Sequence, residues 1–186
     1  MRRFGFLLAA LAATVLLTPA AASADPNNES HTFQLHIEVP NVSEASNGDR
    51  VAVTGSGVFS VHPKSVTASG GFTHTNSQGG VVASGSWTAT DLLSFEFYGC
   101  GVLTFPDPDQ TLPPNFCGGA LKLAVTLRPT GTSLMLPAIL TIFCIVGPQT
   151  PATHDDPTGE GITLVVPGHV NFNKIVSGMN IYIKTS

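Results

Sequence analysis

Charged residues are scarce in this chain of 186 residues, in which 8 basic and 12 acidic side chains make up 11% of the sequence. The surplus of acidic groups disfavours a nucleic-acid partner and electrostatic adhesion to an anionic membrane. After the N-terminal segment, no apolar run reaches the length of a membrane-spanning helix. The motifs of nucleophilic, phosphate-binding and zinc-dependent enzymes are also absent, among them G-x-S-x-G and H-E-x-x-H. We therefore predict no catalytic residue, metal ligand or cofactor.

The N-terminal segment has the three parts of a secretory signal peptide. It starts Met-Arg-Arg-Phe, continues through an apolar stretch at residues 5–17 and reaches Ala22-Ser23-Ala24. A membrane anchor is the alternative, but the apolar stretch is short for a span and small residues crowd its end. We expect residues 1–24 to be a signal peptide and residues 25–186 to be one secreted, extracellular domain. Such a domain of 162 residues buries about two-thirds of its unfolded surface.

A short pattern, Ser-Gly followed closely by an aromatic residue, occurs three times between Arg50 and Thr90. The copies read SGVFSV from Ser56, SGGFTH from Ser69 and SGSWTA from Ser84. Because side chains alternate along a strand, each glycine shares a face with the aromatic residue two positions later. This face is apolar and the opposite face is rich in Ser and Thr, which indicates half-buried antiparallel strands. The inward aromatic residues, expected to form one buried cluster that can plug the interior, are Phe59, Phe72, Trp87 and, on the next segment, Phe95.

Further alternating segments predict a larger sheet. Strands are expected at residues 31–39, at 92–99 after a break at Asp91, at 119–128 and in three segments near the C-terminus, with loops at 40–49, 100–118 and 147–161. The apolar run at 134–146 is either a strand covered on both faces or one that starts after Pro137. We predict an all-β fold: a single antiparallel meander of eight to ten strands closed into a small β-barrel, with a β-sandwich as the alternative. The inward glycines favour the barrel because they permit sharp coiling of the sheet.

Three cysteines follow the predicted signal peptide: Cys100, Cys117 and Cys144. Two should pair in an oxidising compartment, and one must remain free or bond elsewhere. Cys100 and Cys117 flank a loop with four prolines, whereas Cys144 stands in an apolar segment. We predict a disulfide between Cys100 and Cys117, and a buried, inert thiol at Cys144 in preference to a catalytic one.

The long loops determine where a ligand site is expected. If successive strands run up and down, the loops at 40–49, 99–118 and 147–161 share one end of the barrel, and long loops at a barrel mouth commonly bind ligands. His74, the titratable side chain on the inner face of the repeats, and its neighbour Trp87 are candidate ligand contacts. Phe105 and Phe116 are two more, because the disulfide would hold them over the mouth as a lid.

The same loops contain several acidic residues and one histidine. Carboxylates are ligands of Ca²⁺ and other hard cations, but the spacing matches no EF-hand or zinc pattern, so no metal site is predicted. The residues concerned are Asp107, Asp109, His154, Asp155, Asp156 and Glu160.

In layout the chain resembles small secreted barrels such as the lipocalins and the allene oxide cyclase-like proteins. Neither family's signature residues are present, so no site is transferred. The leading hypothesis is a secreted, non-catalytic protein that binds a small apolar or amphipathic ligand, or a surface partner, at its long-loop end. The alternative is a structural or envelope-associated protein that contacts polysaccharide through its hydroxyl-rich face, and a barrel-confined cyclase or isomerase comes third. We expect no nucleic-acid partner and no membrane span in the mature protein.

Overall fold

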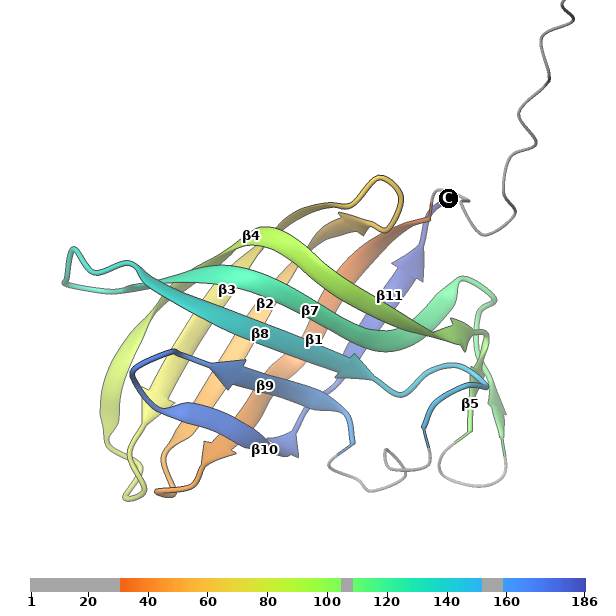
Figure 1. Ribbon diagram of the computed structural model, residues 1–186. Helices are drawn as coiled ribbons and strands as arrows, with labels where there is room; N and C mark the ends of the chain where they lie inside the picture. The colour runs from red at the N-terminus through yellow and green to blue at the C-terminus, as the bar shows by residue number, and fades with distance from the viewer. Residues whose placement is uncertain (1–30, 105–108, 152–158) are drawn as a thin grey trace, which may run out of the picture.

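The computed structural model describes residues 31–104, 109–151 and 159–186, which form strands and their connections (Figure 1). The predicted signal peptide lies outside the described residues. Within the described ranges, no helix is long and apolar enough to cross a membrane. The strands are β1 (Thr32–Ala45), β2 (Arg50–Ser60), β3 (Ser65–Thr75), β4 (Val81–Cys100), β5 (Val102–Leu103), β6 (Gln110–Thr111), β7 (Phe116–Pro129), β8 (Leu136–Cys144), β9 (Gly161–Val165), β10 (Asn171–Ser177) and β11 (Asn180–Lys184).

Nine strands form one antiparallel sheet, and eight of them close a ring. Around the ring the order is β1, β2, β3, β4, β7, β8, β9 and β10, and β10 pairs back onto β1. Neighbours in the ring follow one another along the chain, apart from the small β5–β6 hairpin inserted between β4 and β7, so the predicted all-β meander is confirmed. A sheet that closes on itself leaves few unpaired strand edges.

The ninth strand, β11, continues the line of β10 along the same side of β1. β1 pairs with β11 through Phe33–Ile37 and with β10 through Val42–Ala45. Between these two stretches the register of β1 against β2 shifts, so that residues 38–40 bulge out of the ladder. The ladder resumes at Asn41, with the same alternating face of β1 still pointing inward. The prediction of a loop from residue 40 was therefore wrong up to Ala45, which belongs to β1.

Beyond this bulge, two polar side chains of β1 face the interior. Asn41 and Ser43 are fully buried, and both have partners, as buried polar groups require. The amide of Asn41 donates to Oδ1 of Asn180, and the Ser43 hydroxyl lies 3.1 and 3.0 Å from the carbonyl oxygens of Phe172 and Lys174. These contacts connect β1 to β10 and β11, the last strands of the chain.

Trp87 shows why the repeats carry inward glycines. Gly70 stands between Gly55 and Trp87 in the register of β2, β3 and β4. A Cβ atom on Gly55 would lie 2.4 Å from the indole ring, so only glycine leaves room for that ring. The indole Nε1 donates to the carbonyl oxygen of Thr54 at 2.8 Å, and Trp87 is only 1% exposed. The predicted inner face of the repeats is confirmed, since Phe59 and Phe72 are buried as well.

The predicted strand at 92–99 is the second half of β4 and not a separate strand. The expected break at Asp91 is a β-bulge, one of three register shifts between β4 and β7. This bulge reverses the faces, so that Leu92 is buried while Leu93, which simple alternation places on the same face as Phe95, is 40% exposed. Because bulges bend a strand, β4 bends after it leaves β3 and continues beside β7 (Figure 1).

The bent half of β4 adds Phe95 to a cluster of aromatic rings. The Phe95 ring centroid lies 4.9 Å from that of Phe59, 5.2 Å from that of Phe33 and 5.4 Å from that of Tyr182. Phe72 and Trp87 belong to the same hydrophobic core. The aromatic cluster of Phe33, Phe59, Phe95 and Tyr182 fills one half of the interior.

The two ends of the ring differ in their connections. One end carries four hairpin turns, at residues 46–49, 76–80, 130–135 and 166–170, and we call it the hairpin end. The other carries the turn at 61–64 and the two long connections, at 101–115 and 145–160, and we call it the disulfide end. The expectation that all long loops share an end with the turn at 76–80 was wrong. Once both halves of β4 are one strand, every later connection moves to the opposite end.

The predicted disulfide is present at the disulfide end. Cys100 and Cys117 are partners in the β4–β7 ladder, and their sulfur atoms lie 2.05 Å apart. Cys144, at the end of β8, is a buried free thiol whose pKa is raised by burial. β8 starts at Leu136 and includes Pro137, and its outer face, with Ile139, stays partly exposed. Neither predicted interpretation of the 134–146 run was therefore correct.

Candidate functional site

A cavity of about 420 Å³ lies inside the hairpin end of the ring. Seven of the eight ring strands, or the turns next to them, contribute to its wall, and nearly all the lining side chains are apolar. Its volume is within the range of small-molecule sites in proteins. The lining residues are Val51, Phe72, His74, Val82, Ala83, Leu127, Pro129, Thr132, Leu134, Leu136, Leu164, Val166, His169, Val170 and Phe172.

The cavity exists because inward side chains differ in size between the two halves of the ring. In the disulfide half the interior is filled by the aromatic cluster. On β4 the inward residues nearest the hairpin end are small: Ala83 faces His74, and Gly85 faces Phe72. Trp87 is the first large inward residue along this strand. The interior is therefore not plugged throughout, and a hollow remains between Ala83 and the facing wall of β9 and β10.

A His–Asp pair stands at the edge of this cavity. His74 Nε2 lies 2.9 Å from Asp49 Oδ2, and both side chains are only 17% exposed. The His74 ring packs edge-on against Phe172 at 5.2 Å, which holds it on the cavity wall. The hydrogen bond from His74 is the main cause of a lowered pKa at Asp49. A carboxylate that fixes an imidazole in this way leaves its second ring nitrogen available to hydrogen-bond a ligand or to transfer a proton.

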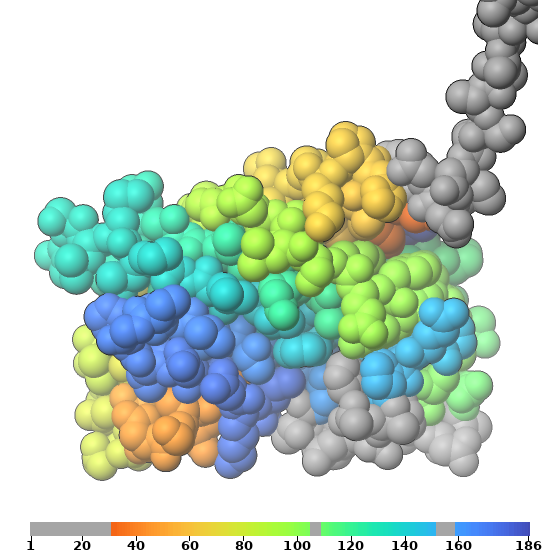
Figure 2. Space-filling view, in the orientation of Figure 1, coloured from red at the N-terminus to blue at the C-terminus, as the bar shows by residue number. Residues whose placement is uncertain are grey.

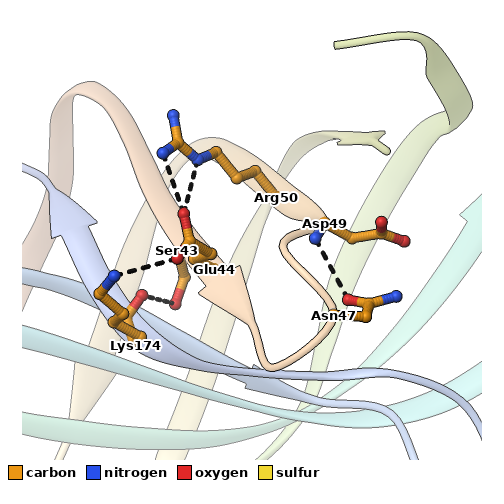
Figure 3. Close-up of polar contacts among 6 residues, drawn as sticks. All are labelled: Ser43, Glu44, Asn47, Asp49, Arg50 and Lys174. Carbon is orange, nitrogen blue, oxygen red and sulfur yellow. Dashed lines mark hydrogen bonds and ion pairs between the residues drawn. The ribbon is translucent and has the colours of Figure 1, made fainter. Parts of the chain in front are cut away.

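A polar hollow of about 830 Å³ adjoins the cavity and shares His169 and Val170 with it. Glu44 stands at its edge between two cations: Lys174 Nζ lies 3.0 Å from Oε1 and Arg50 2.9 Å from Oε2 (Figure 3). The hydrogen bonds from Lys174 and then Arg50 lower the Glu44 pKa. The remaining lining groups are mainly small polar residues of the β1–β2 turn and of β10: Ser46, Asn47, Asn171 and Asn173.

The opposite side of the cavity mouth is apolar. Val81 and Val82 at the start of β4, and Leu134 and Met135 before β8, are each more than half exposed. Val82 and Leu134 also line the cavity. Figure 2 shows the β7–β8 connection, which contains Leu134 and Met135, projecting beyond the rest of the ring at this end. The mouth thus has one apolar side, formed by these four residues, and one polar side, formed by the His–Asp pair and the polar hollow.

Of the four predicted ligand contacts, the three that the structure describes do not come together. His74 lines the cavity, whereas Trp87 is enclosed in the core next to it. Phe116 is at the disulfide end, where it pairs with Ile183 of β11. Phe105 lies outside the described residues. The disulfide-closed loop is at the end opposite the cavity, so it does not cover this cavity as a lid.

Two polar residues of the site were missed from the sequence. Asp49 could have been identified from the sequence. It follows the Asn47-Gly48 turn and directly precedes Arg50, and Arg50 pairs with Thr75, the neighbour of His74. His169 had none, since it reaches the cavity only through the closure of the ring by β9 and β10. Of the residues considered as cation ligands, Asp107, His154, Asp155 and Asp156 lie outside the described residues. In the described ranges, no three His, Cys, Asp or Glu residues are grouped to hold a metal.

Glu160 is a partly buried carboxyl group away from the cavity lining. Its Oε1 accepts the backbone N–H of Asn180 at 2.7 Å, where β11 begins. Burial raises the pKa of Glu160 to about 7, and the hydrogen bond from Asn180 opposes this shift only in part. The group therefore exchanges its proton near neutral pH, at the junction between β9 and β11.

Comparison with protein-family models, with curated proteins and with solved structures found no match. The function is therefore argued from the geometry of the cavity and its mouth.

Proposed function

We propose that this protein is a secreted, non-catalytic binding protein, and that its ring of strands acts as a small barrel holding a small apolar or amphipathic molecule. The ligand site is the cavity at the hairpin end, in place of the long-loop end expected from the sequence. The observation that carries the proposal is an apolar cavity of about 420 Å³ that is bordered on one side by a fixed His–Asp pair. Apolar walls with a few placed polar groups are typical of small-molecule sites.

The driving force would come from the apolar wall. Transfer of each CH₂ group from water into such a wall contributes about 0.8 kcal/mol, before the cost of immobilising the ligand is subtracted. Affinity for a homologous series of linear alcohols should therefore rise with chain length until the cavity is full. The hydroxyl group of such an alcohol would remain at the mouth, near His74 or His169.

The test is calorimetric titration of the secreted protein with linear alcohols of increasing length. Ala83→Leu fills the cavity from β4 and should weaken binding at least about tenfold, since the side chain replaces roughly three buried carbon positions of the ligand. Ala52→Leu is the matched control, because Ala52 is the partner of Thr73 on the outer face of β2. It should bind as the wild type does. If the wild type binds no alcohol, or if Ala83→Leu binds as well as Ala52→Leu, the proposal is wrong.

A second candidate is contact with polysaccharide through the outer face. Hydroxyl side chains form one continuous cross-strand row over four strands, and three of the four are exposed. Regularly spaced hydroxyl groups can hydrogen-bond a flat polysaccharide surface. The row consists of Ser56, Ser69, Thr88 and Thr126. Thr88→Lys should abolish co-sedimentation with insoluble polysaccharide if this face is used, and should leave alcohol binding unchanged.

A further inference from the structure

We infer that the polar hollow beside the cavity is the head-group site of the same ligand, and that this ligand carries an uncharged, polyhydroxylated head on an apolar tail, as a glycolipid does. This inference rests on the proposed function, because the tail is assigned to the cavity. It adds the chemical class of the ligand and the residues that select it.

Continuity of the two spaces is the first argument. His169 and Val170, in the turn between β9 and β10, line both the cavity and the hollow. A molecule that extends out of the cavity over this turn enters the space between the β1–β2 turn and β10. On the other side of the mouth it would meet the exposed apolar residues Val82 and Leu134. The polar part of an amphipathic ligand therefore has one favourable direction to leave the cavity.

The hydrogen-bonding groups of the hollow suit sugar hydroxyls. An amide side chain both donates and accepts, and so does a hydroxyl group, so the two match without any ionised partner. Asn47 and Asn171 use their carbonyl oxygens to accept the backbone N–H groups of Asp49 and Val166, at 3.1 and 3.2 Å. These bonds fix the orientation of both side chains and leave the NH₂ donors to a ligand. Asn173, on β10, adds a third amide at the exposed side of the hollow.

The charges of the hollow disfavour an ionised head. Glu44 is paired with both Lys174 and Arg50, so part of the positive charge at this edge of the hollow is already compensated (Figure 3). An anionic head would have to compete with Glu44 for its two partners. A cationic head would have to displace Lys174 or Arg50 from Glu44. Breaking a charge-assisted hydrogen bond offsets the gain from forming a new one. An uncharged head meets neither penalty.

The experiment compares ligands that share one tail. Octyl glucoside, 1-octanol, octyl sulfate and octyltrimethylammonium are titrated into the full secreted chain, each below its micelle concentration. Octyl glucoside should bind about three- to tenfold more tightly than 1-octanol, as one or two added hydrogen bonds allow, and neither ionised compound should exceed it. Asn173→Ala should remove most of this advantage and leave the affinity for 1-octanol unchanged.

Asn115→Ala provides the matched control, because Asn115 is exposed at the disulfide end, far from the hollow in the ring. It should bind octyl glucoside as the wild type does. If 1-octanol and octyl glucoside bind equally, the head-group inference is wrong while the proposed function stands. If octyl sulfate binds most tightly, the site selects an anion and the inference is again wrong. If no octyl compound binds, the inference and the proposed function both fall.

Discussion

Replacement of Trp87 by alanine is the strongest test of how the interior is built. The indole ring lies over Gly55 and Gly70, and neither glycine has a side chain that could move into the space it leaves. β2 and β3 are paired through Arg50–Ser60 and Ser65–Thr75, so the backbone cannot collapse onto the gap without breaking its ladder. The cavity left by Trp87→Ala should therefore persist. Its cost should be near the upper end of the usual range of about 3 to 5 kcal/mol for removal of a buried aromatic ring.

A Trp87→Phe variant separates the hydrogen bond from the packing. Phenylalanine retains part of the buried ring but cannot donate to the Thr54 carbonyl oxygen, which the indole reaches at 2.8 Å. The loss of that donor should cost about 1 to 3 kcal/mol. Thr73→Ala, on the outer face of β3, is the control and should change the free energy of unfolding by less than about 0.5 kcal/mol, as surface substitutions usually do.

Urea unfolding followed by far-ultraviolet circular dichroism measures all three variants on one scale, since the two Trp87 variants lack the protein's one tryptophan. In the wild type, Trp87 fluorescence should be that of a buried indole and should shift on unfolding. A loss below about 1 kcal/mol for Trp87→Ala, or emission typical of an exposed indole in the native protein, would refute the assignment of Trp87 to the core. A large loss for Thr73→Ala would mean that another element or subunit covers the outer face.

Two further predictions concern titration and the disulfide. Burial raises the pKa of Glu160 from an ordinary value near 4.5 to about 7, so the unfolded chain releases this proton at lower pH than the folded chain does. The free energy of unfolding should therefore fall by up to about 3 kcal/mol as the pH rises from about 4.5 to 7, and Glu160→Gln should flatten this fall. If urea unfolding shows the same pH dependence for Glu160→Gln as for the wild type, the raised pKa of Glu160 is contradicted. Reduction of Cys100–Cys117 should increase hydrogen exchange first in the β4–β7 connection. β2 and β3 should stay protected, because their ladder does not depend on the disulfide. Loss of protection in β2 and β3 at the same time as in the connection would argue against this.

Strands with an uninterrupted alternation could be predicted from the sequence, and strands with bulges could not. β2, β3 and β7 each keep one apolar face along the ladder, and the inward aromatic residues of β2 and β3 were identified correctly. In β4 a bulge inserts a residue that reverses the faces, whereas in β1 a bulge interrupts the ladder without reversing them. In the sequence, both resemble the end of a strand. The bulge near Asp91 had the larger consequence. Counting β4 as two strands placed every later connection at the wrong end of the ring.

The candidate site was predictable only where it depends on strands that follow one another in the chain. His74 follows from the inner face of β3, which the repeat pattern defines, and Asp49 from the pairing of β2 with β3. His169 comes from a turn that meets the β1–β2 turn only when β10 pairs with β1 and closes the ring. No local pattern encodes that meeting, because the segments are more than a hundred residues apart. Phe105 and Phe116 were selected because large apolar side chains in a loop need an explanation, and that argument does not say which end of the ring the loop occupies.

The size of the ring explains why such a small difference in sequence decides whether a ligand site exists. An eight-stranded ring has an interior just wide enough to be filled by side chains or to hold one small molecule. The disulfide half takes the first course, with Phe33, Phe59, Phe95 and Tyr182 in contact. The hairpin half takes the second, because β4 presents Ala83 and Gly85 opposite His74 and Phe72. One larger inward side chain on β4 would fill the hairpin half as well. The cavity therefore depends on the two small residues that precede Trp87 in the sequence, Ala83 and Gly85.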